Sequence, residues 1–320
     1  HGGDVPLVGG LSIYLAMLLG ALLWGDTGGD SLTSHGRSLW IFLLAGGLLV
    51  LAGTIDDLRS VSVFSRILTE VLVALLIIEG LDLRAENLGD LLGMGPIVLE
   101  GWVAYPFTVV CIFGVINAYN MLDGMDGVLG VITLITLFSF HLFTGTAPGL
   151  VTIFIGMALL AFLVSNLGLW PVVPKTFLGD AGSKLMGLIV VSLILTVADA
   201  QVAGIKAIEP VTALYLVGLP LYDMTFTTLR RVLRGHSPIR SDRTHIHHLM
   251  QALGLSERRG LLVIGTLGLA SPLMGLTLAR ATTPTPYQFF IFLGLFLLYC
   301  ILMQQAWVVA ERQQPERPLC

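Results

Sequence analysis

The stretch Asn117-Ala-Tyr-Asn-Met-Leu-Asp-Gly-Met-Asp-Gly127 lies between two apolar runs, residues 102–116 and 128–143. It puts two asparagines and two aspartates where one hydrophobic segment ends and the next begins. Burial of such groups costs free energy unless they are hydrogen-bonded or bound to a metal ion. Asp123 and Asp126 are three residues apart, so a helical turn there would place both carboxylates on one face. The stretch is either a solvated polar turn between two membrane helices or part of a functional site.

The composition on either side of this stretch is that of a membrane protein. Of the 320 residues, 55% are hydrophobic and only 12% are charged, and the mean hydropathy is +0.87. A soluble domain of this length would need far more charge on its surface, whereas apolar runs of about 18–20 residues, long enough to span a bilayer, recur throughout. We therefore predict an all-α polytopic membrane protein with one integral-membrane domain over residues 1–320.

Ten apolar segments are predicted to cross the membrane: residues 7–24, 38–55, 64–81, 102–119, 127–143, 150–168, 181–199, 209–228, 261–279 and 287–307. The sequence opens at His1 without a methionine, so we expect one further transmembrane helix before residue 1 and eleven in the full protein. The ten segments divide the polar loops into two alternating sets. One set holds 13 of the 17 lysines and arginines, and the positive-inside rule makes it cytoplasmic.

Every acidic motif falls on this cytoplasmic side. Asp56 and Asp57 end the second apolar run, where adjacent like charges favour binding of a proton or a cation. Arg66 follows closely and is placed to answer either a phosphate or the acids themselves. The alternative for this pair is solvated charge at a helix terminus.

Two further motifs extend the set. Phe177-Leu-Gly-Asp-Ala-Gly-Ser183 opens an apolar run, so Asp180 is predicted in the first turn of a helix, where an anion or a bridging Mg²⁺ is favoured; a capped turn is the alternative. Residues 241–248 contain three histidines close to several arginines. No fourth ligand has zinc-site spacing, so phosphate binding is favoured over zinc, with a solvated basic loop as the alternative.

Taken together, these motifs offer acids to hold Mg²⁺ and basic groups to neutralise phosphate, which are the parts of a phosphoryl-transfer site. A site at the membrane edge allows one substrate to be a lipid.

The chain resembles the polyprenyl-phosphate N-acetylhexosamine-1-phosphate transferases. The matching stretches are His1-Gly-Gly-Asp-Val-Pro-Leu-Val-Gly-Gly10, Gly53-Thr-Ile-Asp-Asp57, 117–127, 177–183 and 242–248. The resemblance implies attack of a polyprenyl-phosphate oxygen on the β-phosphorus of a UDP-N-acetyl sugar, with release of UMP. It implies Mg²⁺ as cofactor, with Mn²⁺ as a substitute. Overall similarity favours UDP-N-acetylglucosamine and undecaprenyl phosphate as substrates. It implies a protein of the bacterial inner membrane with its active site on the cytoplasmic face. The product would initiate O-antigen or a related cell-envelope glycan. No nucleic acid is implied, and the oligomeric state is open, a homodimer included.

The resemblance also implies residue roles. The acidic pair Asp56 and Asp57 is assigned to the lipid phosphate, as base or on the metal side, with Arg66 binding that phosphate. Asn120 and Asp180 match positions that hold Mg²⁺ at the pyrophosphate. Asp123 and Asp126 are assigned to catalysis in the acidic turn, and Asp126 also matches a position that grips uracil. Binding of the nucleotide sugar is assigned to Asn166, Phe177, Arg243, His245, His247 and His248.

Three rival classes remain. A transporter would also carry intramembrane acids, but its sites gather near the bilayer midplane, whereas these acids fall at segment ends on one side. Membrane CDP-alcohol phosphotransferases and aromatic prenyltransferases carry acidic signatures that do not occur after Asp123 or elsewhere. Release of UMP from a UDP-sugar discriminates, because a transporter would not give it.

Overall fold

A computed structural model describes residues 5–24, 36–59, 61–198, 208–237 and 244–313. Among these residues every regular element is a helix, apart from one isolated β-bridge between Asn87 and Val98. The elements are α1 (Gly9–Trp24), α2 (Gly36–Leu58), α3 (Val63–Leu81), α4 (Gly101–Leu122), α5 (Val128–Thr144), α6 (Leu150–Asn166), α7 (Gly179–Ala198), α8 (Pro210–Leu214), the 3-10 turn η1 (Tyr215–Val217), α9 (Gly218–Leu233), α10 (Ile246–Ala252), α11 (Glu257–Arg280) and α12 (Thr285–Gln313). The predicted all-α class is confirmed.

Helices overlap all ten apolar segments that the sequence predicts. Five of the described helices are long and apolar enough to cross a membrane: Ser38–Leu58, Gly101–Leu122, Gly179–Ala198, Glu257–Arg280 and Thr285–Arg312. Three shorter apolar helices, α1, α5 and α6, accompany them. The chain is thus a multi-pass membrane protein, whereas the count of ten spans stays a prediction.

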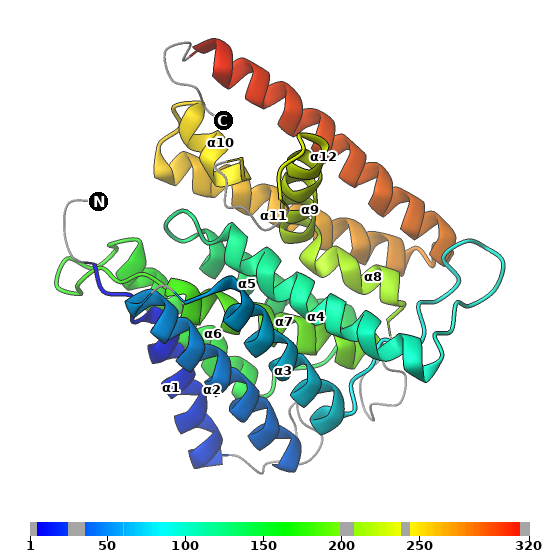
Figure 1. The fold of residues 1–320 in the computed structure, drawn as a ribbon, viewed down its shortest axis with the longest axis horizontal. Coiled ribbons are helices and arrows are strands. Elements are labelled where there is room, and N and C mark those ends of the chain that lie inside the picture. The colour runs from blue at the N-terminus through cyan, green and yellow to red at the C-terminus, as the bar shows by residue number, and fades with distance from the viewer. Residues whose placement is uncertain (1–4, 25–35, 60, 199–207, 238–243, 314–320) are drawn as a thin grey trace.

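The eighth predicted segment, 209–228, is not one continuous helix. It divides into α8, η1 and α9, and the break precedes Gly218 and Pro220. Proline lacks an N–H and is tolerated in a first helical turn but not in a helix interior, so a new helix begins at Gly218. Helix α9 packs on α4, α11 and α12, and Figure 1 shows α12 on the side of the molecule opposite α1 and α2.

Helix α7 is the centre of the bundle. All residues from Ala181 to Val197 are buried, and α1, α2 and α4 pack on it. The approach is backbone to backbone: a Cβ atom added to Gly10 would lie 2.2 Å from the amide nitrogen of Gly182, and one added to Gly53 would lie 2.4 Å from the Cα of Ala181. Small residues at helix contacts allow this spacing in membrane proteins.

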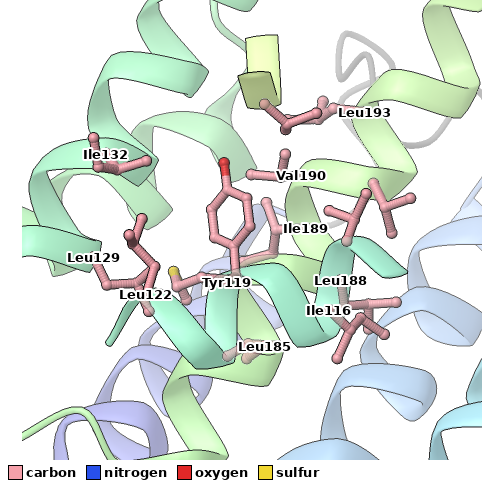
Figure 2. Packing of buried hydrophobic residues seen from close by; sticks show 14 of the residues in the cluster. Ile116, Tyr119, Leu122, Leu129, Ile132, Leu185, Leu188, Ile189, Val190 and Leu193 are labelled. Atoms are coloured by element: carbon pink, nitrogen blue, oxygen red, sulfur yellow. The ribbon is translucent and has the colours of Figure 1, made fainter. Parts of the chain in front are cut away.

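Side chains from α4, α5 and α7 fill the core beside this contact. Figure 2 shows Tyr119 of α4 pointing between Ile132 of α5 and Val190 of α7. Its hydroxyl lies 3.0 Å from Thr136 Oγ1, which also donates to the carbonyl of Leu216 at 3.1 Å. Because a buried hydroxyl needs a partner, this chain of hydrogen bonds fixes α4 and α5 against η1.

A buried ion pair and a hydrogen bond join α7 to α3 and α4. Lys184 Nζ of α7 lies 3.1 Å from Glu70 Oε1 of α3, and Asn117 Nδ2 of α4 donates to Glu70 Oε2 at 2.6 Å. A buried charge is stable only when paired and hydrogen-bonded. The triad therefore restricts how α3, α4 and α7 meet.

The close contact on α7 predicts the effect of adding one methyl group. In Gly187→Ala the new Cβ would lie 2.6 Å from the Cα of Ile116, a backbone atom that cannot rotate away. We expect the protein to lose about 1–3 kcal/mol of stability, as overpacked cores do, and to unfold at lower temperature in detergent. Gly156→Ala in α6 is the matched control, because nothing lies within 4 Å of its added Cβ. Equal unfolding temperatures for the two variants would contradict this packing.

Candidate active site

A cavity of about 330 Å³ opens at one end of the bundle. It is formed by the end of α2, the turn between α4 and α5, the end of α6 and the start of α7. Seven of the residues that the sequence assigns to the site line it: Asp57, Asn120, Asp123, Asp126, Asn166, Phe177 and Asp180. Acids from three motifs far apart in the chain therefore meet in one place.

The corner between α2 and α7 holds Asp57. The backbone amide of Asp180 donates to Asp57 Oδ1 at 3.1 Å. Asp57 Oδ2 is buried and has no hydrogen-bond partner among the described residues. Gly179 has φ of +71° and leaves room for this oxygen, since a Cβ there would lie 2.5 Å from Oδ2. Because unsatisfied buried carboxylate oxygens are costly, Asp57 is held ready for a cation or a donor.

Asn120 and Asp180 face the same cavity from α4 and α7. Ser183 Oγ donates to Asn120 Oδ1 at 2.6 Å, which fixes the amide against the first turn of α7 and leaves the oxygen a second lone pair. As the sequence predicts, Asp180 lies in that first turn. Among the described residues no three His, Cys, Asp or Glu side chains form a ready metal cage. Mg²⁺ usually takes one or two carboxylates together with substrate phosphates, so this oxygen donor set, with the unpaired Asp57 oxygen beside it, fits a Mg²⁺ that is also held by a bound substrate.

The acidic turn differs in detail from the helical turn expected for it. Helix α4 ends at Leu122, and Asp123 and Asp126 follow in a non-helical turn. Both carboxylates still reach the cavity. Burial, reinforced by the negative charges of Asp180, Asp126 and Asp57, raises the pKa of Asp123 to about 7. Asp126 instead forms an ion pair with Lys175.

Asn166 and Phe177 lie at the wall of the cavity. Asn166 Oδ1 accepts from the amide of Gly127 at 2.6 Å, and its Nδ2 donates to the carbonyl of Thr176 at 2.9 Å. Both ends of this amide are thus used to tie the acidic turn to the segment before α7. The Lys175 ammonium lies 5.5 Å from the centre of the Phe177 ring, so this ring forms a flat wall beside a positive charge.

Asp56 and Arg66 do not line the cavity. Arg66 Nε lies 2.7 Å from Asp56 Oδ2, and Arg66 NH2 donates to Oδ1 at 2.8 Å. The Asp56 side chain is 4% exposed and that of Arg66 is 39% exposed. Asp56 therefore holds the partly exposed guanidinium of Arg66 by one hydrogen bond and a short ion pair.

The histidine segment, residues 244–248, packs against the acidic turn that lines the cavity. The His247 ring lies against Gly124, where an added Cβ would be 2.0 Å from Nε2. Burial, together with neighbouring His248 and His245, lowers the pKa of His247 to about 3, so the ring is neutral. His245 and His248 likewise do not line the cavity, and Arg243 lies outside the described residues.

Sequence reasoning missed two polar lining residues, Gln251 of α10 and Glu257 of α11. Both follow a long polar loop whose path the sequence does not specify. It also passed over Asp223, an acid within the apolar segment 209–228; that position was the available signal.

The fold and the site define a multi-pass membrane protein whose acid-lined cavity suits the chemistry of phosphate groups. Residues 39–198 match the family described as glycosyl transferase family 4. The chain belongs to this family.

Named relatives match nearly the whole chain. It is 32% identical to undecaprenyl-phosphate alpha-N-acetylglucosaminyl 1-phosphate transferase of Salmonella typhi, over 99% of this chain and 88% of the relative. The proteins of the same name from Yersinia pestis and Escherichia coli (strain K12) are 33% and 31% identical, each over 97% of this chain and 83% of the relative. None of these names supports the transporter alternative.

The raised pKa of Asp123 predicts a stability gain on removing its charge. Because the folded-state pKa lies above the ordinary value of 3.8, the folded protein binds the extra proton and loses stability as pH rises from about 4 to 7. We expect Asp123→Asn to raise the unfolding temperature, and to raise it more at pH 8 than at pH 5.5. Asp126→Asn is the matched control: it breaks the ion pair with Lys175, so no gain is expected. A gain for Asp123→Asn that does not grow with pH would show that the charge of Asp123 is not the destabilising group.

Proposed function

We propose that this chain transfers N-acetylglucosamine 1-phosphate from UDP-N-acetylglucosamine to undecaprenyl phosphate. An oxygen of the lipid phosphate attacks the β-phosphorus, the bond from that phosphorus to the bridging oxygen breaks, and UMP leaves with that oxygen. The observation that carries the proposal is the convergence of Asp57, Asp123 and Asp180 in one cavity, in a chain similar over its length to transferases of this name. The product would initiate O-antigen or a related cell-envelope glycan.

Asn120 and Asp180 are the residues proposed to hold Mg²⁺, or Mn²⁺ in its place. When bound, the ion would neutralise charge on the pyrophosphate. The fixed amide of Asn120 and the first-turn position of Asp180 support this assignment. Asp57 is a further oxygen donor in the same cavity, and its Oδ2 has no hydrogen-bond partner in the described part of the chain.

The nucleotide would lie against Phe177, whose ring offers a stacking surface for uracil. Asn166 then acts indirectly, because both ends of its amide are already bonded to backbone: it holds the acidic turn in place. Asp126 forms an ion pair with Lys175, so the cavity wall beside Phe177 carries a pair with no net charge.

The lipid phosphate is assigned to Arg66. Asp56 accepts a hydrogen bond from Arg66 NH2 and lies 2.7 Å from Arg66 Nε. A guanidinium has five N–H groups, so Arg66 keeps others for a phosphate. Asp56 would thus orient the group that binds the acceptor. Because His247 is neutral, the histidine segment would contribute hydrogen bonds and packing, and charge for the sugar nucleotide would come from arginines such as Arg243.

The site is proposed to face the cytoplasm of a bacterial inner membrane, with ten spans in this chain. The basis is the uneven distribution of lysine and arginine between the two sets of loops. A homodimer is compatible with this arrangement and is not required by it.

The proposal is tested by UMP release from purified protein in detergent, measured with and without undecaprenyl phosphate across a panel of UDP-N-acetyl sugars. We expect release that needs both Mg²⁺ and the lipid and is fastest with UDP-N-acetylglucosamine. Release that ignores the lipid, or no release, would contradict transfer. Faster reaction with another sugar would replace the donor but keep the reaction.

The metal assignment predicts large losses from two conservative changes. Asp180→Asn and Asn120→Ala should each lower turnover at least about a hundredfold, since a lost ligand costs several kcal/mol of charge stabilisation. Asp82→Asn is the matched control, an exposed acid at the C-terminal end of α3 that does not line the cavity, and should keep parental turnover. Near-parental rates for both variants at saturating Mg²⁺ would remove these residues from the metal site.

The pH dependence of the transfer rate distinguishes two roles for Asp56, orienting Arg66 and acting as a general base. A phosphomonoester has a second pKa of about 6, so the lipid phosphate hardly needs a base at neutral pH. If Asp56 orients Arg66, Asp56→Asn lowers the rate by a similar factor at pH 6.5 and pH 8.5. A defect that shrinks steeply as pH rises would instead identify Asp56 as a general base.

A further inference from the structure

A fully buried aspartate of α9, outside the cavity, is hydrogen-bonded both to the histidine segment at the start of α10 and to α12. Asp223 of α9 is 1% exposed. Its Oδ1 accepts from the amide of Ile246 at 2.9 Å and from the hydroxyl of Tyr299 of α12 at 2.8 Å. Its Oδ2 lies 2.7 Å from Nδ1 of His245. One carboxylate thus binds α10 at its first residue, the residue before α10, and α12.

The second ring nitrogen of His245 is also occupied. Arg231 NH2 lies 3.2 Å from His245 Nε2. A guanidinium has only donors, so Nε2 accepts, and the ring proton lies on Nδ1, where it donates to Asp223. Asp223 and Arg231 therefore fix both the tautomer and the orientation of His245, and neither nitrogen remains for a substrate.

Contacts continue from His245 to the acidic turn. The His245 and His247 rings are parallel, with centroids 5.9 Å apart, and His247 packs on Gly124. Gly124 lies between Asp123 and the rest of the cavity-lining turn. The position of the turn thus depends on the position of the histidine segment, residues 244–248.

We propose that Asp223 is a positioning residue, which holds the histidine segment so that His247 supports the acidic turn during transfer. The proposal rests on the proposed function for its effect on rate. Its structural part, that Asp223 fixes α10, stands apart from any reaction.

Asp223→Asn tests this without a change in size. If the amide keeps its oxygen toward Ile246 and Tyr299, its NH₂ meets the Nδ1 proton of His245. If His245 changes tautomer, its proton meets Arg231. If the amide turns over, its NH₂ meets the N–H of Ile246, which cannot accept. No arrangement satisfies every group, so the segment must loosen.

The matched control is Tyr222→Phe. Tyr222 is the neighbouring residue on α9 and also bonds to α12, but its hydroxyl donates to the carbonyl of Phe292 at 2.9 Å rather than to the histidine segment. It reports what loss of an α9–α12 hydrogen bond does on its own. Tyr299→Phe removes one of the three bonds to Asp223 and leaves the carboxylate in place, so it serves if Asp223→Asn does not fold.

The first measurement is amide hydrogen exchange of residues 246–252 in the purified full chain. We expect faster exchange in Asp223→Asn and in Tyr299→Phe than in the parent, and parental exchange there in Tyr222→Phe. Parental exchange in both Asp223→Asn and Tyr299→Phe, or equal acceleration in Tyr222→Phe, would overturn the positioning role. This result does not depend on whether the parent transfers a sugar phosphate.

The second measurement is kcat and KM for UMP release. Loss of a partner that orients a site group typically costs about 10- to 100-fold, so kcat for Asp223→Asn should fall in that range while Tyr222→Phe stays within about twofold. Because Asp223 acts through His247, the double variant with His247→Ala should be no slower than the slower single variant, whereas independent effects would multiply. Multiplied losses, or a parental kcat in Asp223→Asn, would refute the effect on transfer. A parent that releases no UMP would refute the proposed function and leave the exchange result to decide the positioning role.

Discussion

The contact of α7 with the backbones of α1, α2 and α4 is the constraint on which the rest of the structure depends. Apolar helices in a bilayer gain nothing by hiding from lipid, so close packing between small residues must stabilise their association. Here glycine and alanine on the facing helices let Gly10 and Gly53 approach the first turn of α7. That approach puts Asp57 within hydrogen-bond distance of the Asp180 amide. It also lets Ser183 reach Asn120, so the geometry of the cavity follows from the packing of the helices below it.

In the described part of the chain, the buried charged groups between the helices are paired, whereas a carboxylate oxygen in the cavity is not. Glu70, Lys184 and Asn117 satisfy one another between α3, α4 and α7, and Asp223 accepts three hydrogen bonds. Inside the cavity, by contrast, Asp57 Oδ2 has no hydrogen-bond partner among the described residues. Burial and the neighbouring negative charges raise the pKa of Asp123. Like charges brought together at a cost in stability are typical of functional sites. A bound cation would relieve this cost.

The sequence predicted the apolar segments well because hydrophobic length is a local property, and a helix overlaps every predicted segment. It also predicted that the acids gather at one end, because alternation of spans decides which segment ends are neighbours. It could not predict pairings that depend on tertiary distance. From the sequence, Arg66 could pair with either a phosphate or the acids, and only the fold shows its ion pair with Asp56. The histidines were all assigned to the sugar nucleotide on the basis of their motif. In the structure, both ring nitrogens of His245 are hydrogen-bonded within the protein, and His247 packs against Gly124.

The central claim is that the oxygen groups around the first turn of α7 form a single site for a metal-bound sugar nucleotide. Its most direct test is an experimental structure of the protein with UDP-N-acetylglucosamine and Mn²⁺, in which anomalous scattering locates the ion. The account predicts one Mn²⁺ in the cavity, directly bonded to the Asp180 carboxylate and the Asn120 amide oxygen at about 2 Å, as expected for a small hard cation, and touching the pyrophosphate. Mn²⁺ bound instead at the histidine segment, or a nucleotide in the cavity with no ion beside Asp180, would contradict it.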